Sequence, residues 1–512
     1  MNTLIASPQK YSFLLSKKLQ ADFSWEPVFF LTKRENENEI SDHFPQAVLH
    51  NYIDSVKGVF PVNAKLNLEF YPELIEKLEN SILTACSMLD RNDSNSSSFS
   101  FSERLLFCHN LISKWASILN QSDIQVIVFE EEPHQASDYL LYKVAKALGI
   151  KTILFVRTIS NLGIIPTYDF EKVGVKFKNT LNQNLSSSLK WESTDLSNKN
   201  LEAYLSKLRG NYDQVLKEHL WDQTDSVKNY SKKKKHYYTL IKYFLSKNVF
   251  NVFFQTKENF ESDQKEKNKS FSESRMAYSR FVLYKIKTIF TKWNLYKYYI
   301  KISLRPDLKN EKYVLCALQY QPEKSTCPLG GMFNDQILMI KYLRKYLPKE
   351  VKIFVKEHPS QFVYNYSRYG EYFRNKNYYK RIVEIENTFL LDLSCNIFDC
   401  IDNSDFVASV TGTICWEAVN RSKKAICFGD SWMNGCEGIQ TVKNNNDLKR
   451  AIEYVSNEKN SVNINKISLF ASTISSLEFN AAVGGPSQLI HKNVSEEENA
   501  EILFNAIKWL ES

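Results

Sequence analysis

Short apolar runs alternate with segments of helical spacing between Tyr313 and Phe428, and this rhythm constrains the fold more than any other feature of the chain. The runs have the length and the β-branched or aromatic content of buried strands. Such alternation is typical of a parallel sheet with helices on both faces. We therefore expect strands at Tyr313–Leu318, Val351–Val355, Phe389–Leu393, Phe406–Val410 and Ala425–Phe428, and helices near Asn334–Tyr346, Asn396–Ile401 and Ile414–Asn420.

The N-terminal half shows the same rhythm at Pro27–Thr32, Ile124–Phe129 and Lys151–Val156, which all have the composition of strands. The last two flank a segment of helical spacing, Ser137–Leu148, that Gly149 ends. This order predicts a βαβ unit. The chain thus holds two α/β halves, without an internal sequence repeat, on either side of a helical and charged stretch.

The length of 512 residues and the hydrophobic content of 43% suit about two or three domains. Met1–Gln20 mixes Lys, Ser and Gln among its apolar residues, unlike a secretory signal. No apolar run approaches the roughly 18 residues of a membrane span, so we expect a cytoplasmic protein. Nine cysteines without CxxC spacing indicate reduced thiols and no structural metal.

The formal net charge of +8 is unevenly placed, because the stretch from Lys232 to Lys312 is dense in Lys, Tyr and Phe. Basic residues interleaved with aromatic ones suit an anionic membrane surface or a polyanionic glycan. A solvated helical insertion that packs its apolar face on the protein explains the pattern equally well. Nucleic acid is not expected as a partner, since no recognised binding motif accompanies the charge.

Polar residues follow three of the predicted strands in the second half, where the carboxyl ends of parallel strands form a crevice for nucleotides. Hydroxyls, cations, glycines and a helix start are the groups that hold a phosphate diester or diphosphate. Neither a G-x-G-x-x-G nor a P-loop sequence is present. The candidate phosphate-binding residues are Gln319, Glu323, Thr326, Gly330 and Gly331 in the first loop, Lys356, Glu357, His358 and Pro359 in the second, and Thr411, Gly412 and Thr413 in the third, with Glu417 one helical turn later.

Each of these features also has a simpler interpretation. His358-Pro359 can be a turn or a helix start, Gly330-Gly331 an ordinary loop, Thr413 a helix N-cap and Glu417 a surface residue of its helix. It is their combination at strand ends that favours a ligand site.

An acidic run, Glu130-Glu131-Glu132, follows the predicted strand Ile124–Phe129 and precedes Pro133. A carboxylate at a strand end can accept the proton of a sugar hydroxyl. A solvated acidic turn is the alternative. Glu131 and Glu132 are the candidates for a catalytic base.

Several runs resemble the bacterial capsule polysaccharide biosynthesis family, which includes Kdo transferases of capsule assembly. These runs are Leu318–Glu323, Pro328–Gly331, Asp335-Gln336, Val355–Gln361, Val410–Ala418 and Phe428–Trp432. The resemblance covers about residues 310 to 445. It implies a GT-B fold, in which two Rossmann-like domains face a central cleft and the C-terminal one holds most of the nucleotide sugar. It also implies that His358-Pro359 and the Thr411–Thr413 turn bind the donor phosphate. Related sialyltransferases have an acidic pair followed by Gly, whereas this chain has Pro133.

These observations predict a cytoplasmic glycosyltransferase that is peripheral on the inner membrane face. We expect four parts: a Rossmann-like acceptor domain at 1–205, a basic helical insertion at 206–310, a Rossmann-like nucleotide-sugar domain at 311–480 and a helical tail at 481–512. The donor is a nucleotide sugar, for example of the CMP-Kdo kind. The acceptor is a capsule or other surface polysaccharide or a lipid-linked glycan. His358 acts at the leaving phosphate, and no metal or other cofactor is required. Two alternatives stay open: a teichoic-acid-type transferase of polyol phosphate from a CDP-linked donor, and a non-enzymatic scaffold that binds glycan or membrane.

Overall fold

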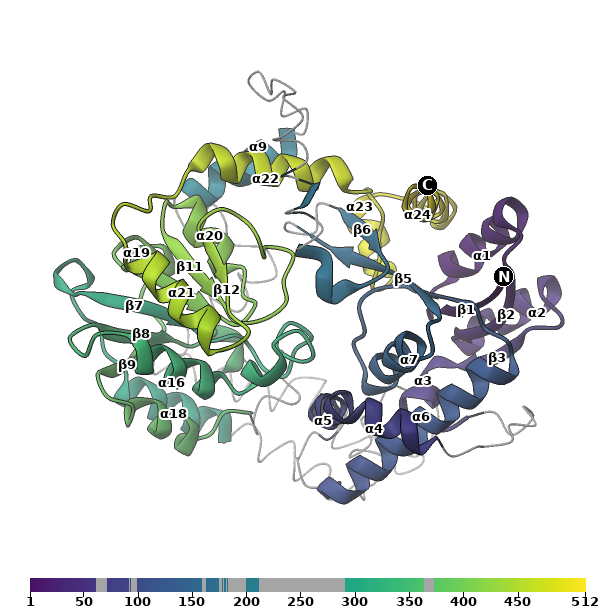
Figure 1. Ribbon diagram of the computed structural model, residues 1–512, viewed down its shortest axis with the longest axis horizontal. Coiled ribbons are helices and arrows are strands. Elements are labelled where there is room, and N and C mark those ends of the chain that lie inside the picture. Colours follow the sequence, from purple (N-terminus) through teal and green to yellow (C-terminus); the bar gives the residue numbers. More distant parts are fainter. Residues whose placement is uncertain are drawn as a thin grey trace, which may run out of the picture. The chain divides into compact units, whose positions relative to one another are not determined.

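The computed structural model describes residues 1–60, 71–91, 93, 99–158, 163–174, 177, 179–180, 182, 199–210, 291–362 and 373–512 (Figure 1). The chain divides into two compact units. The first contains Met1–Leu89, Phe99–Leu189 and Ala471–Ser512, and the second contains Asp90–Ser98 and Lys190–Phe470. Of the predicted basic insertion, residues 211–290 lie outside the described part of the chain.

A six-stranded sheet forms the centre of the first unit, with strand order β3-β2-β1-β4-β5-β6. Its neighbouring strands are parallel except for β6, which runs antiparallel to β5. All four residues of β4 are buried, which explains the uninterrupted apolar sequence of this central strand. The strands are β1 (Asn2–Ala6), β2 (Glu26–Thr32), β3 (Val48–Asn51), β4 (Val126–Phe129), β5 (Lys151–Arg157) and β6 (Ile164–Thr167).

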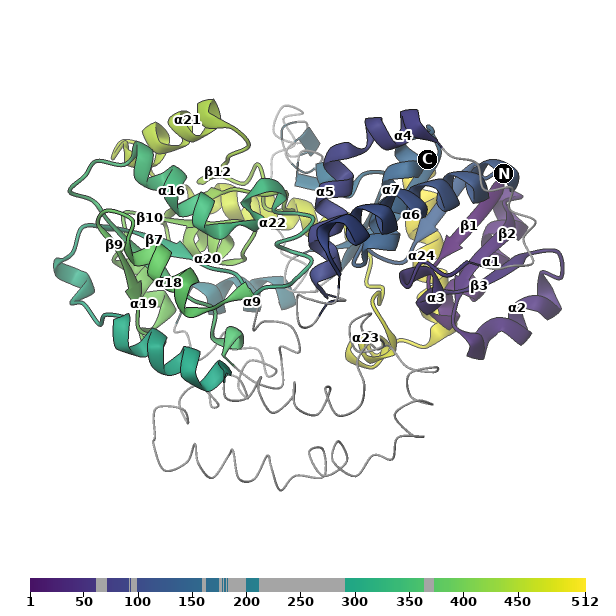
Figure 2. The same ribbon diagram turned by 90° about the horizontal axis from the view of Figure 1, so that it is seen from below.

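Helices cover this sheet, and one of them comes from the end of the chain. The sheet residues Ile5, Val128 and Phe155 share a core with apolar residues of α1 and α24. These two helices pack against each other, as Figure 2 shows. The helices of the unit are α1 (Lys10–Phe23), α2 (Glu37–His43), α3 (Tyr52–Val56), α4 (Pro72–Lys77), α5 (Glu79–Met88), α6 (Phe101–Gln121), α7 (Ala136–Ala147), α23 (Pro486–Lys492) and α24 (Glu496–Glu511), and α22 (Ile464–Leu477) spans the division between the units.

The second unit has its own six-stranded sheet, which is parallel throughout, with strand order β12-β11-β10-β7-β8-β9. Alternate residues of β7, Val314 and Cys316, share a core with the helices α16, α18 and α21. The strands are β7 (Tyr313–Ala317), β8 (Lys352–Lys356), β9 (Thr388–Leu391), β10 (Phe406–Ser409), β11 (Lys424–Cys427) and β12 (Ile439–Thr441), and the helices are α9 (Lys199–Arg209), α16 (Gln336–Tyr346), α18 (Lys376–Val383), α19 (Ile397–Asp402), α20 (Ile414–Asn420) and α21 (Asn445–Ser456).

Both sheets have the same strand order although the sequence shows no repeat. When the strands of each sheet are numbered from its own first strand, both orders read 3-2-1-4-5-6. This is the Rossmann order, whose ligand-binding switch point lies between the first and fourth strands. The prediction of two Rossmann-like α/β halves is therefore confirmed. The central cleft concerns the placement of the two units and stays a prediction.

The predicted tail, 481–512, forms the helices α23 and α24, and both belong to the N-terminal compact unit. The expected domain boundaries at 205, 310 and 480 remain predictions.

Candidate functional site

The switch point of the second sheet brings the first and third predicted loops together. Gln319 follows β7 and Thr411 follows β10. The Thr411 N–H donates to Gln319 Oε1 at 2.7 Å, and Gln319 Nε2 donates to Thr411 Oγ1 at 3.0 Å. The main chain of Gln319 is held in turn by the buried Gln336, which accepts from its N–H at 2.7 Å and donates to its carbonyl at 2.9 Å. Two strand ends are thus joined by a fixed amide and a hydroxyl.

The glycines and hydroxyl residues of these loops have visible packing roles. A Cβ on Gly412 would lie 2.7 Å from Ser409 Oγ, and one on Gly330 would lie 2.4 Å from the Thr326 carbonyl oxygen. Thr326 is buried, and its hydroxyl donates to the Glu323 carbonyl at 2.9 Å. Gly331 has a φ of 53°, which favours glycine. Thr326 and the glycines therefore shape the loop itself.

His358 begins the short 3₁₀ helix Pro359–Gln361, and its Nδ1 accepts the Ser360 N–H at 3.2 Å. The helix-start interpretation is thereby confirmed, without removing the ligand hypothesis. Burial lowers the pKa of His358 to about 4, with further lowering by the charges of Lys356 and Arg374. The imidazole is therefore neutral near pH 7. Because Nδ1 accepts, the proton is on Nε2, which is a hydrogen-bond donor.

Glu357 lies beside His358 and points into a buried network. Its carboxylate pairs with Arg374 at 2.5 Å, and both side chains are fully buried. The Tyr379 hydroxyl donates to the same carboxylate at 2.9 Å, and the His358 N–H donates to its other oxygen at 2.8 Å. Such a buried ion pair is costly to disrupt, since removing one partner leaves the other as an uncompensated buried charge. The contacts of Glu357 are those of a residue that positions the His358 turn.

Arg374 also reaches the first loop. It donates to Gln321 Oε1 at 2.6 Å and to the Gln319 carbonyl at 3.1 Å. Gln321 in turn exchanges hydrogen bonds with the buried Gln361 of the second loop, at 3.1 and 3.2 Å. All three predicted loops are therefore tied together. Sequence reasoning did not name Arg374, Gln321, Gln336 or Tyr379 as site residues, although Gln321 and Gln336 stand in the runs that carry the family resemblance.

Lys356 is buried, and its ammonium donates to the main-chain carbonyls of Asp392 and Leu393, each at 3.2 Å. Burial lowers its pKa. In this arrangement Lys356 ties the end of β8 to the segment after β9. Its predicted contact with a phosphate remains a prediction.

The third loop ends at Thr413, the N-cap of α20, whose side chain makes no capping hydrogen bond. Its hydroxyl donates instead to Glu417 Oε1 at 3.3 Å. Thr413 and Glu417 thus form one polar pair on the first turn of α20, and Thr413 occupies the N-cap position without a capping hydrogen bond from its side chain.

The acidic run follows β4 in the first unit, and two of its three residues are buried. Glu130 accepts from the Ser7 hydroxyl at 3.1 Å, from the Gly484 N–H at 2.7 Å and from the Tyr11 hydroxyl. Burial raises its pKa, and the neighbouring charge of Glu131 adds to the effect. Glu131 pairs with Arg157 at 3.1 Å. Glu132 is buried. The run is therefore not a solvated turn.

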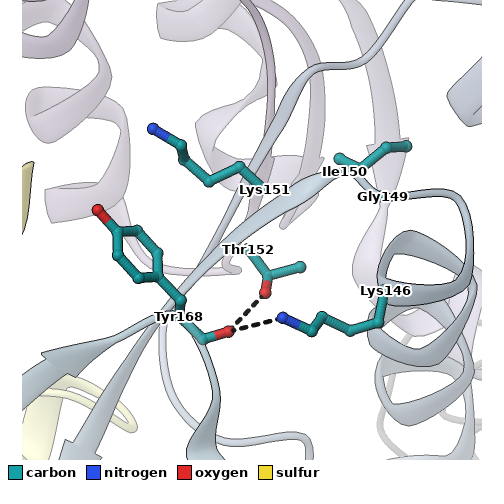
Figure 3. A pocket seen from close by; sticks show the side chains of 6 residues that line it. All are labelled: Lys146, Gly149, Ile150, Lys151, Thr152 and Tyr168. Carbon is teal, nitrogen blue, oxygen red and sulfur yellow. Dashed lines mark hydrogen bonds between the residues drawn. The ribbon is translucent and has the colours of Figure 1, made fainter.

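A cavity of about 280 Å³ lies elsewhere in the first unit, at the amino end of β5 (Figure 3). Thr152 and Lys146 both donate to the Tyr168 carbonyl there, at 2.8 and 3.4 Å, and Lys151 pairs with Glu511 at 2.7 Å. Its lining contains none of the predicted site residues, which follow the carboxyl ends of strands. The cavity is lined by Lys146, Gly149, Ile150, Lys151, Thr152 and Tyr168.

Among the described residues, no group of three or more His, Cys, Asp or Glu side chains is placed to hold a metal ion. Within the same part of the chain, no helix has the length and apolar character needed to span a membrane.

Residues 232–471 match the family model described as "Capsule polysaccharide biosynthesis protein". This part of the chain is similar to the capsule polysaccharide biosynthesis family. The resemblance predicted from the loop motifs is thus confirmed, and the match includes all three loops of the candidate site. A comparison with curated proteins finds no match.

Solved structures similar to this chain include Thermosulfurimonas dismutans KpsC, a β-Kdo 2,7 transferase, at 15% identity over 48% of this chain and 68% of that chain, with a TM-score of 0.24. The β-Kdo 2,4 transferase of the same KpsC is 15% identical over 36% of this chain and 55% of that chain, with a TM-score of 0.23. UDP-GlcNAc 2-epimerase from Methanocaldococcus jannaschii is 11% identical over 93% of this chain and 99% of that chain, with a TM-score of 0.24. Because these scores are low, the likenesses say nothing about donor or acceptor.

Proposed function

We propose that this chain is a glycosyltransferase of capsule polysaccharide biosynthesis that uses a nucleotide-sugar donor. The observation that carries the proposal is the neutral His358, whose Nε2–H is a donor on a turn tied to the switch-point loops. A switch point at strand carboxyl ends is the usual nucleotide site of such sheets. The family match over residues 232–471 supports the same conclusion.

In this reaction an acceptor hydroxyl oxygen attacks the anomeric carbon, and the bond from that carbon to the donor phosphate breaks. Negative charge then grows on the departing phosphate. The His358 Nε2–H stabilises this charge, as does the Thr413 hydroxyl when its hydrogen turns from Glu417 to the phosphate. The networks around Glu357 and Gln319 hold the two turns in place beforehand. Preorganised donors of this kind are worth about 10²–10³-fold in turnover each.

The proton of the attacking hydroxyl goes to a carboxylate of the acidic run after β4. Glu131 and Glu132 are the proposed bases, as general bases typically contribute about 10²–10⁴-fold. In this proposal a neutral imidazole N–H and a hydroxyl stabilise the phosphate charge, so the reaction requires no metal. Activity that persists in excess chelator supports that part, and loss of activity that added Mg²⁺ restores contradicts it.

The test is a calorimetric screen of CMP-, UDP-, GDP- and CDP-linked compounds followed by analysis of the product. We expect one class to bind and a glycosidic linkage to form on a capsule-type acceptor. A phosphodiester product from a CDP-linked polyol identifies the phosphotransferase alternative. If purified, folded protein binds no nucleotide, the scaffold alternative replaces the transferase.

A further inference from the structure

A segment from the end of the chain lies across the carboxyl edge of the first sheet. Ala481, Ala482 and Val483 are buried there. The Asn499 side chain holds the segment by accepting the Ala482 N–H at 2.6 Å and donating to its carbonyl at 2.9 Å. The Gly484 N–H then donates to Glu130 at 2.7 Å. Residues 481–484 are therefore anchored by α24 on one side and by the acidic run on the other.

Arg157, the last residue of β5, connects this segment to Glu131. Its Nη2 donates to the Val483 carbonyl at 2.7 Å and to Glu131 Oε2 at 3.1 Å. Both side chains of the ion pair are about one quarter exposed, at 27% for Arg157 and 25% for Glu131. The guanidinium is thus fixed by main chain while the carboxylate keeps access to solvent.

Gly484 is what lets Arg157 occupy this place. Its φ of 86° favours glycine, and a Cβ built on it would lie 1.7 Å from Arg157 Nη2 and 3.3 Å from Glu131 Oε2. A side chain at this position displaces the guanidinium. Gly485 has a φ of 117°, but the nearest atom to its built Cβ is Gln9 Nε2 at 4.0 Å. The chain therefore offers two neighbouring glycines of positive φ, and a Cβ built on only one of them meets Arg157.

The two neighbouring carboxylates of the acidic run have different surroundings. Glu130 is buried among neutral donors, and its pKa is raised by burial. Glu131 has a cation beside it. When two neighbouring titratable groups lie in environments that shift their pKa values in opposite directions, those environments indicate which group acts as acid and which as base. The charged or titratable groups that act on Glu131 or on its partner Arg157 are Tyr11 on α1, Tyr52 on α3, Glu130 after β4, Asp138 on α7 and Lys492 on α23.

We propose that Arg157, fixed by the Val483–Gly484 turn, is a positioning residue that orients Glu131 and keeps it ionised for removal of the acceptor proton. The segment 481–484 is then part of the acceptor-side site. It is distant in the sequence, since Val483 lies 326 positions after Arg157. This inference rests on the proposed function and names the base and its support.

The decisive comparison is Gly484→Ala against Gly485→Ala, since both strain a backbone of positive φ. We expect Gly484→Ala to lower kcat by about 10²-fold, as small misplacements of catalytic groups do, without changing nucleotide affinity. The acid limb of its kcat/KM–pH profile moves to higher pH, because Glu131 loses its cation. Gly485→Ala keeps the acid limb of the wild type. Equal effects of the two variants would overturn the proposal.

Arg157→Met and Arg157→Lys give a second measurement that needs no transfer reaction. In protein labelled with ¹³C at Glu carboxyl groups, the Glu131 signal is assigned by its loss in Glu131→Gln. We expect Arg157→Met to raise the Glu131 pKa by about 1 or more, and Arg157→Lys to raise it less, because lysine keeps the charge. An unchanged Glu131 pKa in folded Arg157→Met contradicts the inference. Absence of transfer by the wild type with every donor, alongside the expected rise, contradicts the proposed function alone.

Discussion

The two switch points of this protein share a topology and differ in chemistry. In the first sheet, Ser7 after β1 donates to Glu130 after β4, and the Gly484 N–H completes the ring of donors around that buried carboxylate. In the second sheet, Gln319 after β7 and Thr411 after β10 are bridged by an amide and a hydroxyl. Both pairs hold the central strand ends together. An acidic edge repels phosphate and suits proton removal, whereas a neutral edge with N–H and O–H donors suits a departing phosphate.

The comparison also extends to how each edge is braced. The first edge is braced by a chain segment, 481–484, that returns from the far end of the sequence. At the second edge, the Arg374 side chain bonds to both the first and the second loop. Because this fully buried cation joins two loops, loss of its counter-charge has a large effect.

The largest expected effect is therefore on stability, from Glu357→Gln. This variant leaves the Arg374 guanidinium buried without its counter-charge, which costs about 3–5 kcal/mol in the free energy of unfolding. Urea denaturation measures it. Lys380→Met is the matched control, since it breaks an exposed pair with Glu384, at 61% and 56% exposure, where about 1 kcal/mol or less is expected. Equal losses from both variants would mean that Arg374 is not the brace of this edge.

The next effect in size is on turnover, from His358→Ala. Loss of the Nε2–H donor at the leaving phosphate is expected to lower kcat by about 10²–10³-fold. His358→Asn keeps a residue that caps the 3₁₀ helix, so it separates the turn from the chemistry. The exposed His491 on α23 provides a control, because it belongs to the other compact unit from His358. A lower melting temperature with full activity per folded molecule would remove His358 from the site.

A smaller effect separates donor binding from proton removal. Thr413→Val removes a hydroxyl with little change of shape, and loss of a hydrogen bond to a charged phosphate costs about 1.5–3 kcal/mol of nucleotide affinity. Glu131→Gln is expected to leave that affinity unchanged and to lower kcat. Calorimetry and a product assay on the same preparations measure both. If Glu131→Gln loses nucleotide binding while Thr413→Val keeps it, the donor site has been assigned to the wrong sheet.

The sequence predicted the second sheet well because its central strands are buried on both faces. All residues of Tyr313–Ala317 are buried, so the strand reads as a continuous apolar run. Three of the strands that it missed, β3, β6 and β12, have only three or four residues. Such short strands carry too little pattern to be distinguished from loops. The strand β1, Asn2–Ala6, was also missed, because its apolar run Leu4-Ile5-Ala6 is only three residues long.

The candidate site was predictable only where its residues directly follow strands. The switch-point geometry brings Gln319 and Thr411 together, and strand ends mark both in the sequence. Arg374 has partners 17, 53 and 55 residues away, and nothing local distinguishes it from a surface arginine. Lys356 was predicted as a phosphate ligand because it follows a predicted strand, whereas its carbonyl partners appear only after folding. Long-range hydrogen bonds to main chain leave no sequence pattern.

The last predicted effect is a pH dependence of stability that both units share, since burial lowers the pKa of one histidine in each to about 4: His50 within β3 and His358 after β8. Unfolding returns each imidazole to a pKa of about 6.5, so between those values the unfolded state binds more protons than the folded state. The contribution of each neutral histidine to the free energy of unfolding is therefore fully present above pH 6.5. It decreases as the pH falls toward 4, by at most about 1.4 kcal/mol per pH unit. Asp138, with a pKa raised to about 6 by burial, acts in the opposite direction in this window, so only the difference from a histidine variant isolates the histidine contribution.

Urea unfolding of wild type, His50→Gln and His358→Gln at pH 7.5, 6 and 5 measures this contribution. We expect each variant to have a flatter decline than the wild type. A decline that remains parallel to the wild type in His358→Gln would show that this imidazole is not held neutral, and would remove the neutral Nε2–H donor on which the contrast between the two edges depends.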